Sequence, residues 1–509
     1  WEEGYEQRTW LDLRQPIDNR QWRLLTSLRV DPFLTQSEWW PRLDHHWIAQ
    51  PLLRDALSWY EHSSISYVRQ ALPAAPTGGP GAGPATAPPS PGQGYYLWTL
   101  LPYENNVIGE RLVTRQEIDL PFQAGPVKLV PYALGELGHW GQDLGGADPN
   151  QPRTPSSINR AYGQFGVRSS LPFWTADNTV ESRLWNLHGL AHKVILEAEF
   201  SYADSTKDVN QFPLYDQLDD DTINQYRRNI AYFDFNNPSP GSSGLTTPSP
   251  YYAPSPFDFF TPLGGINSGK YDPRSYAIRR GIGSWVTGPS EVVNDLTAFR
   301  VGARQRWQTK RGPYGDRRIV DWVVFDIDGE FFPTTSQNFG QVLGLWQYDF
   351  RWHVGDRTTI LSTADVDFFS LGQQLYTVGA LLNRSARGSL YMGYQSFGGP
   401  INASVLTGSY TYRMSPKWAS SFGSSVDLTG ANIGQRFQLV RIGESFLMSF
   451  GFNVDYSRNN VGVTFAIEPR FLSGTQFAGR SGPSDSAAGT SALGGSPGGA
   501  PIAGAYGLE

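Results

Sequence analysis

The stretch SFLMSFGFNVDYS, residues 445–457, decides the fold class of this chain. Large apolar side chains fill every second position, and the positions between them are mostly small or polar. The apolar set is Phe446, Met448, Phe450, Phe452, Val454 and Tyr456. Because successive side chains of a strand point to opposite faces, a period of two predicts a β-strand, whereas a helix would scatter these residues. After the turn-forming residues 458–460, the stretch 461–470 alternates in the same way.

Many other stretches of the chain alternate over similar lengths. They are residues 111–122, 127–140, 162–174, 192–203, 296–310, 319–332, 389–397 and 406–414. A tilted strand needs about 9–11 residues to cross a bilayer, whereas strands of soluble sandwiches usually have about 5–6. Small polar residues on the second face suit a water-filled lumen. The sequence therefore predicts an all-β fold, a large transmembrane antiparallel β-barrel of about 20–26 strands with long Pro/Gly-rich loops.

The composition excludes several classes of protein. A net charge of −6 from 41 Lys+Arg and 47 Asp+Glu leaves no basic footprint, so we expect no nucleic-acid partner. The absence of cysteine excludes disulfides, thiolate metal sites and a cysteine nucleophile. No apolar run approaches the roughly 18 residues that a membrane helix needs. Because the chain starts with Trp1, we take it as mature or trimmed, and the missing leader gives no information on location.

Three segments interrupt the strand pattern. We assign residues 1–472 to the barrel, with Pro/Gly-rich loop insertions at 73–94 and 236–273. Residues 473–509 form a C-terminal tail of Gly, Ser and Ala. Composition predicts disorder for residues 73–94 and for the tail. If these are ordered, we expect the lumen, a neighbouring subunit or an envelope assembly partner to hold them.

One face of the predicted strand 296–310 is rich in cations. It carries Arg300, Arg304, Arg306 and Lys310. Arg or Lys facing lipid at the bilayer midplane costs about 2–4 kcal/mol, so these side chains face a lumen or lie near a rim. They can bind phosphate or carboxylate groups of a glycolipid. Alternatively, acids on a neighbouring strand neutralise them, the candidates being Asp326, Asp328 and Glu330.

An acidic group offers a possible cation site. It consists of Asp216, Asp219, Asp220 and Asp221. Carboxylate oxygens suit Ca²⁺, although the group lacks EF-hand spacing and can simply be a solvated loop. His188 and His192 have the spacing of a zinc helix but lack the intervening general-base Glu. No nucleophile motif occurs, so we predict a protein that is not an enzyme and uses no cofactor beyond a possible Ca²⁺.

Several whole strands resemble a known family. The stretches are GERLVTRQEIDLPFQAGPVKLVPYALGELGHWGQDL (109–144), HGLAHKVILEAEFSYADSTKDVNQFPLYDQLDDD (188–221), RQRWQTKRG (304–312), GSYTYRMSPKW (408–418) and SFGFNVDYSRNNVGVTFAIEPRF (449–471). They resemble the barrel of the lipopolysaccharide-assembly family LptD, also called OstA, in its divergent planctomycete-like form. The resemblance spans roughly residues 100–472 and rests on strand texture and turn motifs.

This resemblance implies a barrel of about two dozen strands in the outer membrane of a Gram-negative bacterium. Lipopolysaccharide would arrive from periplasmic bridge proteins through a jelly-roll domain, its sugars crossing the lumen and its lipid leaving between the first and last strands. An LptE-like lipoprotein would plug the barrel. Two family features are not matched: there is no room for a complete jelly-roll before the barrel, and no cysteine for interdomain disulfides.

The lateral gate also has a physical basis in the residues. Barrel closure pairs the first and last strands, and Pro removes a donor from that ladder. The gate candidates are Pro16, Pro32, Phe465, Ile467 and Pro469. Since each ladder hydrogen bond contributes about 0.5–1.5 kcal/mol, a seam containing Pro opens more easily. Alternatively, Pro469 simply ends its strand.

The sequence thus predicts an outer-membrane barrel that translocates lipopolysaccharide or a related glycolipid. Three alternatives stay open: a porin-like passive channel, a structural barrel in a larger envelope assembly, and a large soluble sheet or propeller. The last lacks a visible repeat of blade length.

Overall fold

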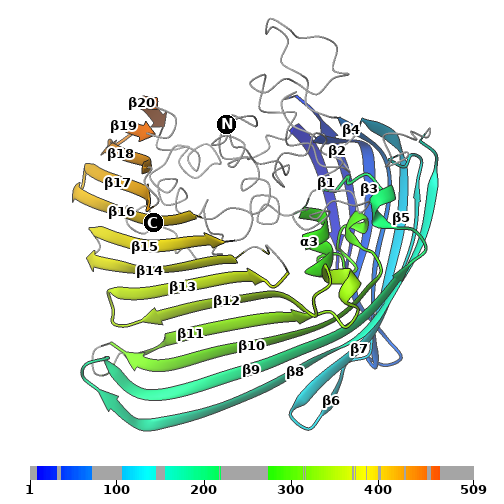
Figure 1. Cartoon of the computed structure of the whole chain (residues 1–509), viewed down its shortest axis with the longest axis horizontal. Helices are drawn as coiled ribbons and strands as arrows, with labels where there is room; N and C mark the ends of the chain where they lie inside the picture. The colour runs from blue at the N-terminus through cyan, green and yellow to red at the C-terminus, as the bar shows by residue number, and fades with distance from the viewer. Residues whose placement is uncertain are drawn as a thin grey trace, which may run out of the picture. The chain divides into compact units, whose positions relative to one another are not determined.

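Twenty β-strands form one hydrogen-bonded sheet in the computed structural model of the chain (Figure 1). The structure describes residues 9–30, 36–71, 106–144, 155–216, 218, 273–312, 315, 317–369, 372, 374–385, 387–398, 403–428, 432–455 and 460–469. The predicted fold class, an all-β antiparallel barrel of about 20–26 strands, is confirmed with 20 strands in this part of the chain.

The chain divides into two compact units. Unit 1 comprises Trp1–Ser170, Ala198–Arg300 and Glu330–Gly344, and unit 2 comprises Leu171–Glu197, Val301–Gly329 and Leu345–Glu509. The first strands of unit 1 are β1 (Thr9–Ile17), β2 (Arg20–Leu28), β3 (Gln36–Leu52), β4 (Leu57–Ala71), β5 (Val107–Asp119), β6 (Phe122–Ala124) and β7 (Val127–Trp140). Strands β1 to β5 pair antiparallel in chain order. Strand β7 then pairs antiparallel with both β5 and the short β6.

Five strands belong partly to each unit, and eight follow them. The five are β8 (Ile158–Ser182), β9 (Leu187–Ser205), β10 (Leu296–Arg311), β11 (Arg318–Phe331) and β12 (Leu343–His353). The eight are β13 (Thr358–Asp367), β14 (Gln374–Ser385), β15 (Gly388–Gly398), β16 (Ala403–Ser415), β17 (Trp418–Asp427), β18 (Asn432–Ile442), β19 (Phe446–Asp455) and β20 (Asn460–Pro469). From β12 to β20 the strands pair consecutively as antiparallel hairpins.

Helices are few and short in the described residues. They are the 3-10 helices η2 (Val209–Gln211), η3 (Ser290–Val292) and η4 (Thr335–Asn338), and the α-helix α3 (Pro273–Arg279). Pro273 occupies the first position of α3, where its missing N–H costs nothing. Gly281 follows the helix with a φ of +70°, a left-handed conformation that reverses the chain. No helix among these is long and apolar enough to cross a membrane.

The predicted strands correspond to observed ones. The stretch 445–457 contains β19, and the stretch 461–470 contains most of β20. The two strands pair with Phe450 opposite Phe465. Of the predicted insertion 236–273, only Pro273 is described. Residues 73–94 and the tail 473–509 lie outside the described residues.

Burial in the strands is inverted relative to a soluble sheet. Along β5, Arg111 and Arg115 are buried, whereas the alternate residues Ile108 and Leu112 are exposed. Arg115 is 1 % exposed and Leu112 is 40 % exposed. The same holds on β8, where Arg160 is buried and Phe165 is 56 % exposed. We call the strand face that carries the buried charges the inner face, and the other the outer face.

Unit 2 also exposes an apolar face. Its large exposed side chains include Val378, Met392, Leu406, Phe450, Phe452, Val463, Phe465 and Ile467. The residues between them are small or polar, such as Ser449 and Gly451 on β19. The alternation that decided the fold class therefore places its apolar residues on the exposed side.

Candidate functional site

The inner face of unit 1 is covered by part of the chain itself. Two stretches of the connection between β9 and β10, residues 208–216 and 273–295, lie against β3, β4, β5, β7 and β8 (Figure 1). We call these two stretches the plug. An apolar cluster joins the first of these stretches to the strands, consisting of Leu25, Trp39, Val68, Val113, Trp140, Ile158, Phe212 and Tyr215. Most of the polar contacts are made by buried charges.

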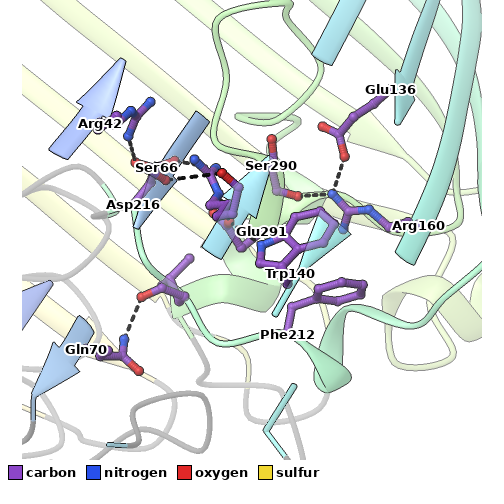
Figure 2. A network of polar contacts seen from close by, with 12 residues as sticks. Arg42, Ser66, Gln70, Glu136, Trp140, Arg160, Phe212, Asp216, Ser290 and Glu291 are labelled. Carbon is purple, nitrogen blue, oxygen red and sulfur yellow. Dashed lines mark hydrogen bonds and ion pairs between the residues drawn. The ribbon is translucent and has the colours of Figure 1, made fainter. Parts of the chain in front are cut away.

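The first buried charge cluster joins two strands to both stretches of the plug (Figure 2). Arg111 on β5 donates from Nε to Glu291 Oε1 at 2.7 Å and from Nη2 to Asp216 Oδ2 at 2.8 Å. Arg42 on β3 binds the other oxygen of Asp216. Trp140 Nε1 also donates to Glu291 Oε1, at 3.0 Å. Two arginines thus bind Asp216 and Glu291 of the plug, and Arg42 also binds Asp44 on its own strand.

The second cluster lies on β5, β7 and β8. Glu136 accepts from Arg115 Nη2 at 2.5 Å and from Arg160 on β8, and all three side chains are fully buried. Arg115 Nη1 also donates to the carbonyl oxygens of Gly283, Trp285 and Gly288, at 2.8–3.1 Å. Arg160 Nη2 donates to the carbonyl of Ser290 at 2.5 Å (Figure 2). These arginines satisfy carbonyls of a plug segment that has little secondary structure of its own.

A third contact fixes the turn of the plug near Trp285. The Arg168 guanidinium lies between the rings of Tyr132 and Trp285, 3.8 and 3.9 Å from their centroids. Arg168 Nη1 donates to Glu117 Oε1 at 2.9 Å, and Glu117 Oε2 accepts from Val286 N at 3.1 Å. Cation–π stacking and the charged hydrogen bonds therefore hold this turn against β5 and β8.

Asp216 is ionised in the first cluster. Burial alone raises the pKa of its carboxyl, but Arg42 and Arg111 act against this and hold the pKa below its ordinary value of 3.8. Because the folded state lowers the pKa, the ionised carboxylate stabilises the fold above about pH 3.8. This stabilisation is lost as the pH falls through the lowered pKa.

Asp216→Asn should therefore lower the free energy of unfolding at neutral pH by about 1.5–3 kcal/mol, the usual range for a hydrogen bond to a charged group. The difference from wild type should narrow as the pH falls below about 3.8, because the unfolded wild-type carboxyl takes up a proton there before the folded one does. The urea concentrations at the unfolding midpoints of wild type and variant, measured over a pH series, check this. A difference that stays constant down to the lowest pH would contradict it.

The predicted cationic face is paired with acids. Arg300 on β10 donates to the carbonyl of Arg279 at 3.0 Å, capping α3, and lies 3.7 Å from Glu330. Arg304 makes two hydrogen bonds to Asp328, at 2.7 and 2.8 Å. Of the two interpretations, the structure thus shows the neutralising one for these arginines.

The other cations of this face differ from each other. Arg306 binds Asp326 through two hydrogen bonds, at 2.6 and 2.9 Å. Lys310, near the end of β10, is exposed. Both side chains of the Arg304–Asp328 pair are about one-third exposed, at 32 % and 36 %. The pairs therefore remain accessible to solvent.

The acidic group is described only in part. Asp216 binds Arg42 and Arg111, as above, while Asp219, Asp220 and Asp221 lie outside the described residues. A Ca²⁺ site at this group stays a prediction. Of the two histidines with zinc-helix spacing, His192 stacks on Trp307, with 4.3 Å between ring centroids.

The gate candidates lie on terminal strands of the described sheet. Pro16 is exposed on β1 opposite Gln21, and Pro469 is the last residue of β20, opposite Phe446. Phe465 and Ile467 project from the outer face of β20, 63 % and 52 % exposed. Pro32 lies outside the described residues. The gate stays a prediction.

Sequence reasoning missed the plug and the charges that hold it. Arg111, Arg115 and Glu117 occur at alternate positions of one predicted strand, a signal of a buried polar face. Glu291, the partner of Arg111, lies 180 residues away from it in the sequence, in a stretch with no strand or helix period.

Comparison with known proteins gives matches among solved structures but none by sequence. No protein-family model and no curated protein matches the sequence. Similar solved structures include one described as "Asymmetric conductivity of engineered proteins", with 11% identity, 72% of this chain and 91% of that chain covered, and a TM-score of 0.25. A triple mutant of the Rhodopseudomonas blastica porin aligns at 10% identity over 72% of this chain and 91% of its own, with a TM-score of 0.24. At these values the likeness carries no inference of function.

Proposed function

We propose that this protein is a β-barrel of the bacterial outer membrane. The inverted burial of its strands carries the proposal. In water, such a sheet would be destabilised at both faces. Val378, Phe450 and Phe465 would expose apolar surface to the solvent, and Arg115 and Glu136 would lose their hydration on burial. In a bilayer, the same outer face meets acyl chains and the charged inner face is kept away from lipid.

A pair of adjacent substitutions on β19 tests the membrane assignment. Phe450→Arg on the outer face should lower the free energy of unfolding in lipid bilayers by about 2–4 kcal/mol, the cost of Arg near the bilayer midplane. Ser449→Arg, one residue earlier on the opposite face, is the matched control and should cost much less. Folding yield into liposomes measures both. If Phe450→Arg folded as well as Ser449→Arg, the outer face would not contact lipid.

We further propose that the barrel moves lipopolysaccharide or a related glycolipid to the outer leaflet, as the resemblance to the LptD family implies. Two features support this. The resemblance covers roughly residues 100–472. The ion pairs of Arg304 and Arg306 are solvent-accessible, so each arginine can exchange its acid partner for a phosphate of passing glycolipid. Periplasmic bridge proteins and an LptE-like lipoprotein are the proposed partners.

Photocrosslinking in cells tests the transport proposal. A photoreactive residue at position 304 samples the sugar path, and one at position 467 samples the lipid path at the proposed gate. Adducts with glycolipid at both positions are expected. Position 392, on the outer face of β15, is the control for contact with bulk membrane lipid. An adduct pattern at 304 and 467 no different from that at 392 would contradict directed transport.

A porin-like passive channel is the second candidate. The paired, partly exposed charges Arg304–Asp328 and Arg306–Asp326 favour it, because balanced charges beside water suit the passage of small polar solutes. Ion conductance of the purified barrel in planar bilayers separates the two candidates. Steady conductance without glycolipid adducts would support the channel.

A further inference from the structure

We propose that Asp44, His46 and His62 form a binding site for a divalent transition metal, with Zn²⁺ as the best-suited ion. The three side chains lie on β3 and β4, and their ligand atoms are all within 4.8 Å of one another. The site is independent of the proposed transport function, because it rests only on two paired strands of unit 1.

The strand register brings the three residues together. His46 on β3 pairs directly with His62 on β4, and Asp44 lies two residues before His46. Residues directly opposite in an antiparallel pair, and those two apart on one strand, share a face. All three therefore project from the inner face, which also carries Arg42. Two imidazoles and one carboxylate meet at one place on that face.

The donor set suits zinc chemistry. Imidazole nitrogen and carboxylate oxygen bind Zn²⁺ at about 2.0–2.2 Å, and three protein ligands leave one tetrahedral position for water. Imidazoles also favour transition metals over Ca²⁺ or Mg²⁺, which prefer oxygen ligands. Ligand atoms of a tetrahedral site lie roughly 3.3 Å apart at these bond lengths. Binding of the ion therefore requires rotation of the histidine side chains to close the present spacing of up to 4.8 Å.

Neighbouring groups already orient the carboxylate. The side chain of Asp44 is buried, and both its oxygens accept from Arg42 Nε, at 2.8 and 3.0 Å. Arg42 is itself held by Asp216 of the plug. Such outer contacts fix the geometry of a metal ligand and raise its affinity for the ion.

Contacts within the proposed site position the two imidazoles. His62 Nε2 lies 3.0 Å from Asp44 Oδ1. The His46 ring stacks on His62 with 4.1 Å between centroids and 15° between planes. In the described part of the chain, no group hydrogen-bonds the ring nitrogens of His46, which leaves them available to an ion. A hydrogen-bonded Asp44–His62 pair with no metal is the alternative explanation.

The neighbouring histidine provides a matched control. His45 precedes His46 and lies on the opposite face, where its Nδ1 is 2.6 Å from Glu61 Oε2. Substituting His45 removes an imidazole from the same strand without touching the three proposed ligands. Any non-specific binding of metal by imidazole groups is thus measured in the same background.

The test uses the full-length barrel, folded in detergent and stripped with a chelator. Zn²⁺ is titrated by calorimetry, and Co²⁺ is added separately to record visible d–d bands of a tetrahedral site. Wild type and His45→Gln should bind one ion per chain at micromolar concentration, and Zn²⁺ should raise their unfolding temperatures. His46→Gln and His62→Gln should each lose the Co²⁺ bands and at least tenfold in affinity.

Gel mobility of unheated samples confirms that each variant is folded before it is titrated. If His46→Gln or His62→Gln binds like wild type, or if folded wild type binds no ion, the site does not exist. Loss of binding in His45→Gln alone would place the ion on the outer face and overturn the assignment equally.

Discussion

Glu136→Ala should lower the free energy of unfolding by about 3–5 kcal/mol, the usual cost of removing one partner from a buried ion pair. Glu136 is the acid shared by Arg115 and Arg160, and the side chains of all three are at most 1 % exposed. Without it, two guanidinium groups stay buried and unneutralised, and carbonyl oxygens of the plug are their hydrogen-bond partners among the described residues. Because these arginines also bind the plug, its stretch 273–295 should loosen as well.

Urea titration of the barrel in lipid bilayers, followed by tryptophan fluorescence, measures this loss. Arg14→Gln is a suitable control, because Arg14 forms an ion pair with Asp12 at an exposed place on β1 and Asp12 keeps its contact with Arg23. That variant should unfold at the wild-type urea concentration. Equal midpoints for Glu136→Ala and Arg14→Gln would mean that the buried charges contribute nothing to holding the plug.

Replacing residues 208–295 by a short turn should raise the ion conductance of the barrel several-fold. The plug covers the inner face of β3, β4, β5, β7 and β8, and its removal exposes Arg42, Arg111 and Arg115 to water. A short turn can join the strands, since β9 pairs with β10 and Ser205 N lies 2.7 Å from Asp295 Oδ1. The exposed cations should also shift the selectivity of the conductance toward anions.

Conductance in planar bilayers and the reversal potential in a salt gradient check both effects. Glu291→Gln is a graded control, because it keeps the plug but weakens its hydrogen bonds to Arg111 and Trp140. Its conductance should lie between that of wild type and that of the variant without the plug. Conductance equal to wild type after removal of the plug would place the route of ions away from this inner face.

The strands could be predicted from the sequence because their signal is local. The alternation of Phe446, Met448 and Phe450 is set by neighbours two residues apart, and it predicted both the strand and its exposed face. The pairing of Arg304 with Asp328 was one of two interpretations that the sequence left open. Both residues lie on long predicted strands, so the possible partners were few.

The plug and the proposed metal site depend on long-range geometry that no local pattern contains. Glu291 meets Arg111 only after the connection between β9 and β10 has folded back onto the strands. His46 and His62 meet because of the β3–β4 register, which shifts at two irregularities, between Trp39 and Arg42 and between Trp47 and Gln50. A bulge changes which residues are opposite one another, and the sequence does not show where it occurs.

The connection between β9 and β10 also determines the order in which the protein can assemble. Most strand pairs of the sheet are hairpins whose ends are brought together by a turn of a few residues, as between β1 and β2. Ser205 and Asp295, by contrast, are 90 residues apart. The entropy lost on closing a loop grows with its length, by about 0.6 kcal/mol for each doubling. Pairing of β9 with β10 is therefore a late event, and hairpins on either side of it can form first, as two separate folding nuclei.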